Sequence, residues 1–166
     1  QAAGIASDLN QMEEAVDLMK KACSLYREHG APDTAAATIS KAAKMCESAL
    51  PVRSVEMYIE AADLCEDDEK LRDASNYLNR ASCLEIKQKR FVQSCEIMKK
   101  RLQLIKNIGN MQIGYPIILE LVITYLAEED CVAADNAYKM GFDLNGFGAS
   151  DEAVYCEHFL KAFEDG

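Results

Sequence analysis

The feature that most constrains this chain is a pair of small residues, seven positions apart, that recurs about every 20 residues. Two residues with this spacing lie on one face of an α-helix, and small side chains there let a neighbouring helix approach closely. One helix about every 20 residues means a helical hairpin about every 40, which is typical of α-solenoids. The pairs are Ala15/Ala22, Ala35/Ala42, Val55/Ala62, Ala74/Ala81 and, with a shift, Ser94/Arg101 or Cys95/Leu102.

The recurrence predicts an all-α fold, a TPR-like α-solenoid of antiparallel helical hairpins that forms a twisted sheet. The first helix is expected to face the core with a stripe that repeats at offsets of three and four residues. Gly30 should end this helix in a left-handed conformation, and Asp33 is the expected N-cap of the next. The stripe consists of Ala15, Leu18, Met19, Ala22, Leu25 and Tyr26.

Three further helices are expected after Gly109, which breaks the pattern, so the prediction is eight helices in all. The segment from about Tyr115 to Leu126 is apolar nearly all round. Its β-branched residues would suit a strand, but its length and helical neighbours favour a buried helix. A short helix should follow over Cys131 to Met140, and Ser150 should cap the last one.

The domain organisation expected from the sequence is one TPR-like helical domain over residues 1–166, with repeat hairpins in 1–110 and C-terminal helices in 111–166. No linker rich in Pro, Gly or Ser interrupts the pattern. The first residue is Gln rather than Met, and neither end carries the polar cap that an open solenoid needs. We therefore expect a fragment of a longer chain.

The seven cysteines predict a reducing compartment. Their number is odd, no Cys-x-x-Cys occurs, and most of them fall on expected apolar helix faces. Such residues usually behave as small buried hydrophobes, so free thiols in a cytoplasmic protein are expected. The longest apolar run, Ile117 to Tyr125, is far shorter than the roughly 20 residues of a membrane span.

The net charge of −10 is distributed unevenly. Residues 1–79 carry a net charge of −7, residues 80–106 of +6, and residues 120–166 of −9. Arg80 and Lys87 are seven positions apart and share a helix face, as do Lys99 and Lys106. One interpretation is a solvated face. The other is a basic surface for an acidic protein partner, since the overall negative field disfavours nucleic acid.

The sequence contains no pattern that points to catalysis. We find no phosphate-binding glycine loop, no zinc-binding helix motif and no nucleophile elbow. The two histidines are far apart in the sequence, and acidic clusters such as Asp67/Asp68 lie at expected helix boundaries. No catalytic residue, metal ligand or cofactor is therefore expected, and the protein is predicted not to be an enzyme.

Several segments together resemble the soluble NSF attachment proteins, their gamma form in particular. The resemblance follows the order of the chain and is carried by Leu25–Ala36, Glu69–Ala74, Asp130–Ala134 and the loop Gly146–Glu152. It implies an adaptor that wraps SNARE helical bundles of the syntaxin type and recruits the N-terminal domain of the NSF ATPase, which then unwinds the bundle. It also implies a cytoplasmic protein, peripheral on membranes, whose membrane contact lies in regions absent here. By the same resemblance, this chain is a middle-to-C-terminal fragment of such a protein.

The resemblance assigns the basic residues to SNARE binding. Arg80 falls where alpha relatives have a Lys. Asn76 and Ile113 stand at positions that are basic in the family, and these departures should weaken binding to the SNARE bundle. Together with the charge pattern, this gives the SNARE-binding candidates Arg80, Lys87, Lys89, Arg90, Lys99, Lys100, Arg101 and Lys106.

The acidic candidates for ATPase binding are Glu164 and Asp165, which match acidic positions of the family, and Glu128, which is adjacent to one. Lys161 replaces a third acidic residue of that group. Two other interpretations stay open. The chain could be a generic TPR-like scaffold that holds a peptide or helix in its concave groove, or a solenoid that supports a catalytic domain elsewhere in the protein.

Overall fold

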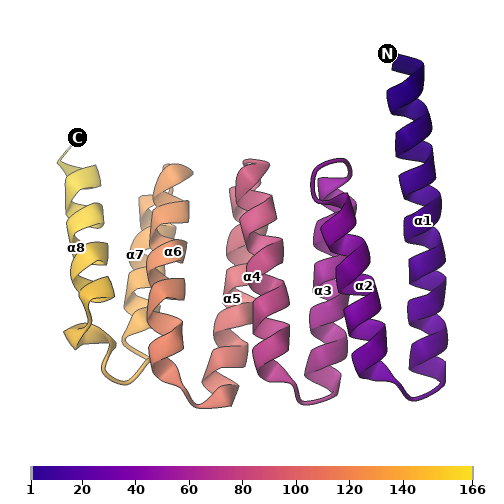
Figure 1. The fold of residues 1–166 in the computed structure, drawn as a ribbon. Helices are drawn as coiled ribbons and strands as arrows, with labels where there is room; N and C mark the ends of the chain where they lie inside the picture. Colours follow the sequence, from indigo (N-terminus) through magenta and orange to yellow (C-terminus); the bar gives the residue numbers. More distant parts are fainter. Residues whose placement is uncertain (1, 166) are drawn as a thin grey trace. The chain divides into compact units, whose positions relative to one another are not determined.

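Every regular element in the part of the chain that the structure describes is helical (Figure 1). The structure is a computed structural model that describes residues 2–165, with side chains described from residue 10. It confirms the all-α fold with eight helices and no strand over these residues. The α-helices are α1 (Ala2–Glu28), α2 (Pro32–Cys46), α3 (Pro51–Asp67), α4 (Leu71–Lys87), α5 (Phe91–Ile108), α6 (Gly114–Ala127), α7 (Cys131–Gly141) and α8 (Asp151–Glu164).

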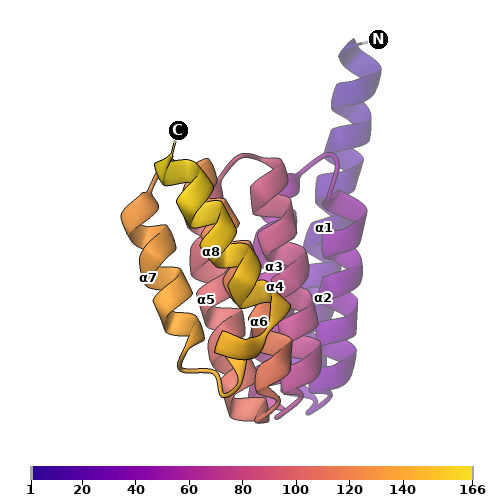
Figure 2. The same ribbon diagram turned by 90° about the vertical axis from the view of Figure 1, so that its left-hand side faces the viewer.

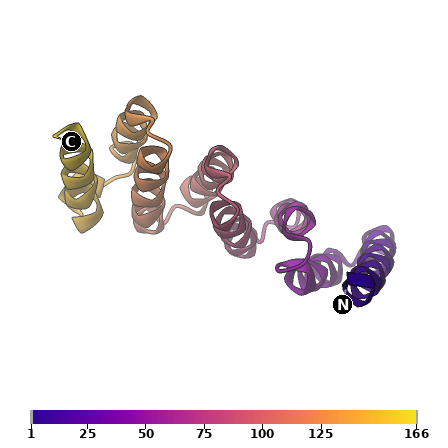
Figure 3. The same cartoon turned by 90° about the horizontal axis from the view of Figure 1, so that it is seen from above.

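The helices fall into two compact units, Gln1–Gln88 and Lys89–Gly166. In the first unit, α1 packs on α2, α2 on α3, and α3 on α4, each antiparallel to the next (Figures 1 and 3). In the second unit, α5 packs on α6, while α6, α7 and α8 all contact one another (Figure 2). Whether the two units behave as the single domain expected from the sequence stays a prediction.

The small-residue pairs of α2, α3 and α4 form helix contacts of the first unit, as expected, whereas Ala15 and Ala22 of α1 are only partly buried. Both members of the pairs in α2 and α4 are fully buried, and so are the pair residues of α3, with exposed fractions of 3% or less. Their short side chains allow the helices to pack closely. The recurrence also continues beyond the five pairs found in the sequence, because Ala134 and Gly141 in α7 are both buried and seven positions apart.

The core-facing stripe predicted for α1 is wrong in its direction. Leu18 and Leu25 are 65% and 55% exposed, whereas Val16 and Cys23 are each 1% exposed. A solenoid helix has two apolar faces, one for each neighbour, and periodicity alone does not say which neighbour covers which face. The helix also begins at Ala2, well before the predicted stripe starts at Ala15.

The turns between helices repeat one backbone geometry. Gly30, Glu69, Lys89, Gly109 and Glu129 each have φ between 57° and 78°, and the last four follow one another every 20 residues. The left-handed residue lies just after the end of one helix, and the residue that follows it is the N-cap of the next helix. Gly30 was expected in this role and Gly109 only as a break in the helical pattern, whereas the three charged residues were not expected.

Two of the expected helix starts can be compared with the structure. Ser150 caps α8 as predicted, because its hydroxyl accepts a hydrogen bond from the Ala153 amide at 3.2 Å. Asp33 is not an N-cap, since Ala31 precedes α2 and Asp33 lies in the first turn. The Asp33 carboxylate instead forms an ion pair with Lys70. Pro32 at the first helical position already starts the helix, so no side-chain cap is required.

The apolar segment after Gly109 is a helix, as preferred over a strand. Helix α6 buries Ile117, Ile118, Leu121 and Val122 completely, but Ile123 is 44% exposed, so burial is not uniform around it. Beside it, Phe147 is fully buried, and the rings of Tyr115, Tyr138 and Phe142 surround it with centroids 5.7 to 6.1 Å away. This aromatic cluster anchors the loop that leads into α8.

Candidate protein-interaction site

A groove of about 280 Å³ crosses α2, α3 and α4 within the first unit. Its charged lining residues are all cations: Lys41 and Lys44 from α2, and Arg80 from α4. The remaining lining residues are Ser40, Tyr58, Asn76 and Tyr77. We call these seven residues the cationic groove. Two of its three cations, Lys41 and Lys44, lie in residues 1–79, a part of the chain whose net charge is −7.

Two tyrosines make the apolar part of the groove. The rings of Tyr58 and Tyr77 stack with centroids 6.3 Å apart and planes inclined by 24°. Tyr58 is only 3% exposed, and its hydroxyl donates a hydrogen bond to Glu47 Oε1 at 2.6 Å. Burial raises the pKa of Tyr58, and the hydrogen bond to Glu47 raises it further. The phenol therefore keeps its proton and donates at neutral pH.

The cations of the groove are open to solvent. Lys41 and Lys44 are exposed, and among the described residues neither is part of an ion pair. Arg80 has a side chain 59% exposed, and its Nη1 lies 3.9 Å from Glu47 Oε1. An exposed pair at this distance is weak. All three cations can therefore reach an acidic ligand.

The sequence analysis selected Arg80 but missed Lys41 and Lys44. The sequence does contain a pattern that links these residues, because Lys41 and Arg80 are 39 residues apart, which is one hairpin period. They occupy corresponding positions in successive hairpins and so come together in the folded unit. Net charges summed over long segments do not show this relationship, because residues 1–79 are acidic on balance.

The other basic candidates lie at the end of α4, in the following turn and along α5. Lys87 and Lys89 are exposed, and Arg90 is the N-cap of α5. Of the eight candidates, only Arg80 belongs to the cationic groove. The combined basic surface expected from the helix that carries Arg80 and the helix that carries Lys99 stays a prediction.

Three of the candidates on α5 form ion pairs with acidic residues of the second unit. Lys99 Nζ lies 2.8 Å from Glu96 and 5.7 Å from the centroid of the Tyr125 ring. Lys106 lies 3.5 Å from Asp143. A partner at these positions would have to compete with carboxylates that are already in place. The fourth candidate on α5, Lys100, is exposed.

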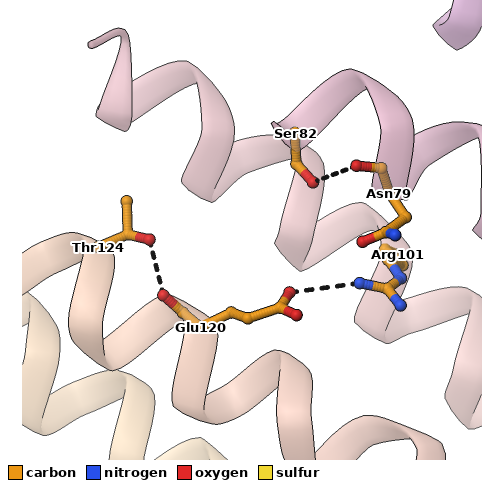
Figure 4. A network of polar contacts seen from close by, with 5 residues as sticks. All are labelled: Asn79, Ser82, Arg101, Glu120 and Thr124. Carbon is orange, nitrogen blue, oxygen red and sulfur yellow. Dashed lines mark hydrogen bonds and ion pairs between the residues drawn. The ribbon is translucent and has the colours of Figure 1, made fainter. Parts of the chain in front are cut away.

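Arg101 is the most enclosed of these cations, with a side chain 15% exposed and its Nη1 3.3 Å from Glu120 (Figure 4). Burial raises the pKa of the Glu120 carboxyl, and the nearby Arg101 charge partly offsets this. The Thr124 hydroxyl donates to the Glu120 carbonyl at 2.7 Å. Figure 4 also shows Ser82 donating to the Asn79 carbonyl within α4, at 3.0 Å. Arg101 thus joins α5 to α6.

The three acidic candidates lie at helix ends. Glu128 follows α6 as its C-cap, Glu164 is the last residue of α8, and Asp165 comes next. All three are exposed. Because successive helices of the second unit are antiparallel, α6 and α8 run in the same direction, and these residues lie at the same end of the unit (Figure 1).

No group of side chains suited to a metal ion occurs among the described residues. Over the same part of the chain, none of the helices combines the length and apolar character that a membrane span requires. All seven cysteines are free thiols, and five of them are buried, which confirms that most are buried: Cys23, Cys46, Cys65, Cys95 and Cys156.

Comparison with known proteins identifies relatives of the whole chain. The chain is 24% identical over 164 residues to the gamma-soluble NSF attachment protein of Dictyostelium discoideum, and 24% identical over 165 residues to that of Arabidopsis thaliana. These alignments cover 99% of this chain but 51% and 57% of the relatives, so the chain spans about half their length. Among solved structures, the chain is similar to BtubC from P. vanneervenii, with a TM-score of 0.36 and 11% identity over 99% of this chain and 90% of that one.

The structural likeness is too low to carry an argument, so the fold rests on the eight helices and the family on the sequence. The model of the family described as soluble NSF attachment protein, SNAP, matches residues 1–166 without a gap at either end. Both curated relatives carry the name of the gamma form. A chain matched by the family model over its whole length, and folded as the repeat of its small residues predicts, belongs to the soluble NSF attachment proteins.

Proposed function

We propose that this chain is the middle-to-C-terminal part of an adaptor that binds SNARE complexes and recruits the NSF ATPase for their disassembly in membrane fusion and vesicle transport. The observation that carries the proposal is the family match over residues 1–166. The chain itself does no catalysis in this proposal. The protein would work in the cytoplasm, peripheral on membranes, with its membrane contact outside this chain.

The proposed SNARE contact is made by basic side chains. The exposed cations Lys41, Lys44 and Arg80 of the cationic groove and the predicted basic residues that follow α4 would face the acidic surface of the helical bundle. Exposed charges of this kind contribute little to folding. They contribute much to the rate and selectivity of association, because complementary fields steer the partners together.

The proposed ATPase contact is made by Glu128, Glu164 and Asp165. These residues lie at one end of the second unit, in a stretch, residues 120–166, with a net charge of −9. A carboxylate at a helix C-terminus is disfavoured by the helix dipole. Helix stability therefore does not account for Glu164, and a basic surface on the ATPase would.

The second candidate function is a generic TPR-like scaffold that binds a single peptide or helix. The stacked rings of Tyr58 and Tyr77 favour it, because aromatic rings beside cations suit one peptide as well as a bundle. Capture of assembled SNARE bundles, compared with capture of the separate SNARE peptides, distinguishes the two. Equal or stronger capture of a single peptide would support the scaffold.

The SNARE contact is tested in the full-length protein by reversing three cations, Arg80→Glu, Lys99→Glu and Lys100→Glu. Capture of an assembled SNARE bundle should fall at least tenfold, and wild-type capture should fall with rising salt, since the Debye length is only about 8 Å at physiological ionic strength. The matched control reverses Lys21, Arg72 and Lys139, which changes the net charge equally. Full binding by the triple variant would show that another face is used.

The ATPase contact is tested with Glu164→Lys and Asp165→Lys in the full-length protein. Recruitment of the ATPase should fall at least tenfold, while capture of the SNARE bundle stays within twofold of wild type. The control replaces an adjacent acidic pair of α1, Glu13→Lys and Glu14→Lys. If the ATPase is recruited as well by the first variant as by wild type, these residues are not its site.

A further inference from the structure

Glu47 is an acidic residue fixed at the edge of the cationic groove. It lies at the C-cap of α2, and its side chain is 27% exposed. The Tyr58 hydroxyl holds its Oε1 at 2.6 Å, and Arg80 Nη1 lies 3.9 Å from the same oxygen. A negative charge is thus fixed beside the cations that would meet an acidic ligand.

Helix stability does not explain a carboxylate in this position. Glu47 follows the last residue of α2, where the helix dipole disfavours negative charge. The buried Tyr58 explains why the side chain stays in place, because a phenol that is 3% exposed needs a hydrogen-bond acceptor. The hydrogen bond from Tyr58 therefore fixes the orientation of the Glu47 side chain.

We propose that Glu47 is a specificity-determining residue of the cationic groove, which weakens the binding of uniformly acidic helices and selects partners with a mixed charge pattern. A partner carboxylate placed against Lys41 or Lys44 is attracted, but a second one placed beside Arg80 is repelled by Glu47. The favoured partner has acidic side chains over the two lysines and an amide or basic side chain over Glu47. Selection by a built-in repulsion is a common source of specificity.

This inference deepens the proposed function, since it names the charge pattern that the same groove would read, but its test does not require a SNARE bundle. The probe is a synthetic coiled coil with Glu at every exposed position. A second coiled coil carries Lys in place of one Glu in each heptad. Affinities of the full-length protein for both are measured by calorimetry at low salt, with circular dichroism to verify the fold of each variant.

Glu47→Gln should bind the uniformly acidic coiled coil about three- to tenfold more tightly than wild type and should lose the preference of wild type for the mixed coiled coil. Tyr58→Phe keeps the charge but frees the carboxylate, so it should give a smaller gain in the same direction. If Glu47→Gln does not fold, the affinities of Tyr58→Phe test the inference instead. The matched control, Glu56→Gln, removes the same charge from the exposed face of α3 and should leave both affinities within twofold.

Unchanged or weaker binding by Glu47→Gln would overturn the inference, and would indicate that Glu47 only positions Arg80. An equal gain with Glu56→Gln would overturn it too, because net charge alone would then explain the effect. Binding of neither coiled coil by wild type would also overturn it. Capture of SNARE bundles by the wild-type protein is measured in parallel. Loss of this capture would contradict the proposed function, whereas the coiled-coil affinities test the role of Glu47.

Discussion

Glu69 and Glu129, sixty residues apart, adopt the same left-handed backbone conformation, with φ of 58° and 60°. Each lies just after the end of a helix, and each precedes the N-cap residue of the next one, Lys70 or Asp130. Gly30 and Gly109 fill the same place in two other turns. The geometry of the turn therefore imposes the conformation, whichever residue occupies it.

Replacing Glu69 by Gly should stabilise the protein by about 1 kcal/mol, because the left-handed conformation costs most L-residues roughly 1–2 kcal/mol and Gly almost nothing. The free energy of unfolding from urea titration measures the effect. As a control, Glu56→Gly in the interior of α3 should destabilise by about 0.5–1 kcal/mol. A loss of stability in Glu69→Gly would mean that its side chain contributes more than its backbone costs.

Ala62→Leu should destabilise the first unit by about 1–3 kcal/mol, because a larger side chain overpacks a closed contact between helices. Ala62 is fully buried in α3, which packs against both α2 and α4. The control Ala37→Leu lies on the exposed side of α2 and should change stability by less than about 0.5 kcal/mol. Chemical denaturation of the two variants distinguishes them, and equal stability would contradict the close packing.

Cys83 and Cys131 should react with a thiol reagent at pH 8 much faster than the other five cysteines, since these two are exposed and the rest are buried. Burial of the thiol and its low thiolate content both slow the reaction. Mass spectrometry of peptides after timed alkylation measures each rate. Rapid labelling of Cys46 or Cys156 would contradict the described core.

The free energy of unfolding should also fall at alkaline pH, because burial raises the pKa of two of the cysteine thiols. Burial raises the pKa of Cys95 and of Cys156 from the ordinary 9.0 to about 11. A group whose pKa is raised in the folded state contributes stability below its unfolded pKa, and this contribution is lost as the pH rises from about 9 to 11. The variant Cys95→Ala/Cys156→Ala should lose less stability than wild type over this range. Parallel pH curves would contradict the shifts.

The two units should unfold together, because the 20-residue recurrence crosses residues 88 and 89 with no linker between them. Pulsed alkylation across a urea titration follows the exposure of Cys46 in the first unit and of Cys156 in the second. Coincident midpoints are expected for one cooperative domain. Midpoints that differ clearly would divide the chain into two domains.

Local sequence patterns determined the helices of this protein. The seven-residue spacing of pairs such as Ala35/Ala42, the breaks at Gly30 and Gly109, and the cap at Ser150 depend on neighbours in the chain, so they can be read without the fold. The segment now seen as α6 was correctly preferred as a helix for the same reason. The ordered segments also sufficed to suggest the family, which the comparison over residues 1–166 shows.

The tertiary structure alone decided which helix faces are covered and which charges meet. The pattern of α1 contains two apolar faces, and only packing shows that Val16 and Cys23, rather than Leu18 and Leu25, are buried. Lys41 and Glu47 lie 39 and 33 residues before Arg80, yet all three lie at the cationic groove. Stacked hairpins bring together residues one period apart, whereas charge counts along a chain record only adjacent residues.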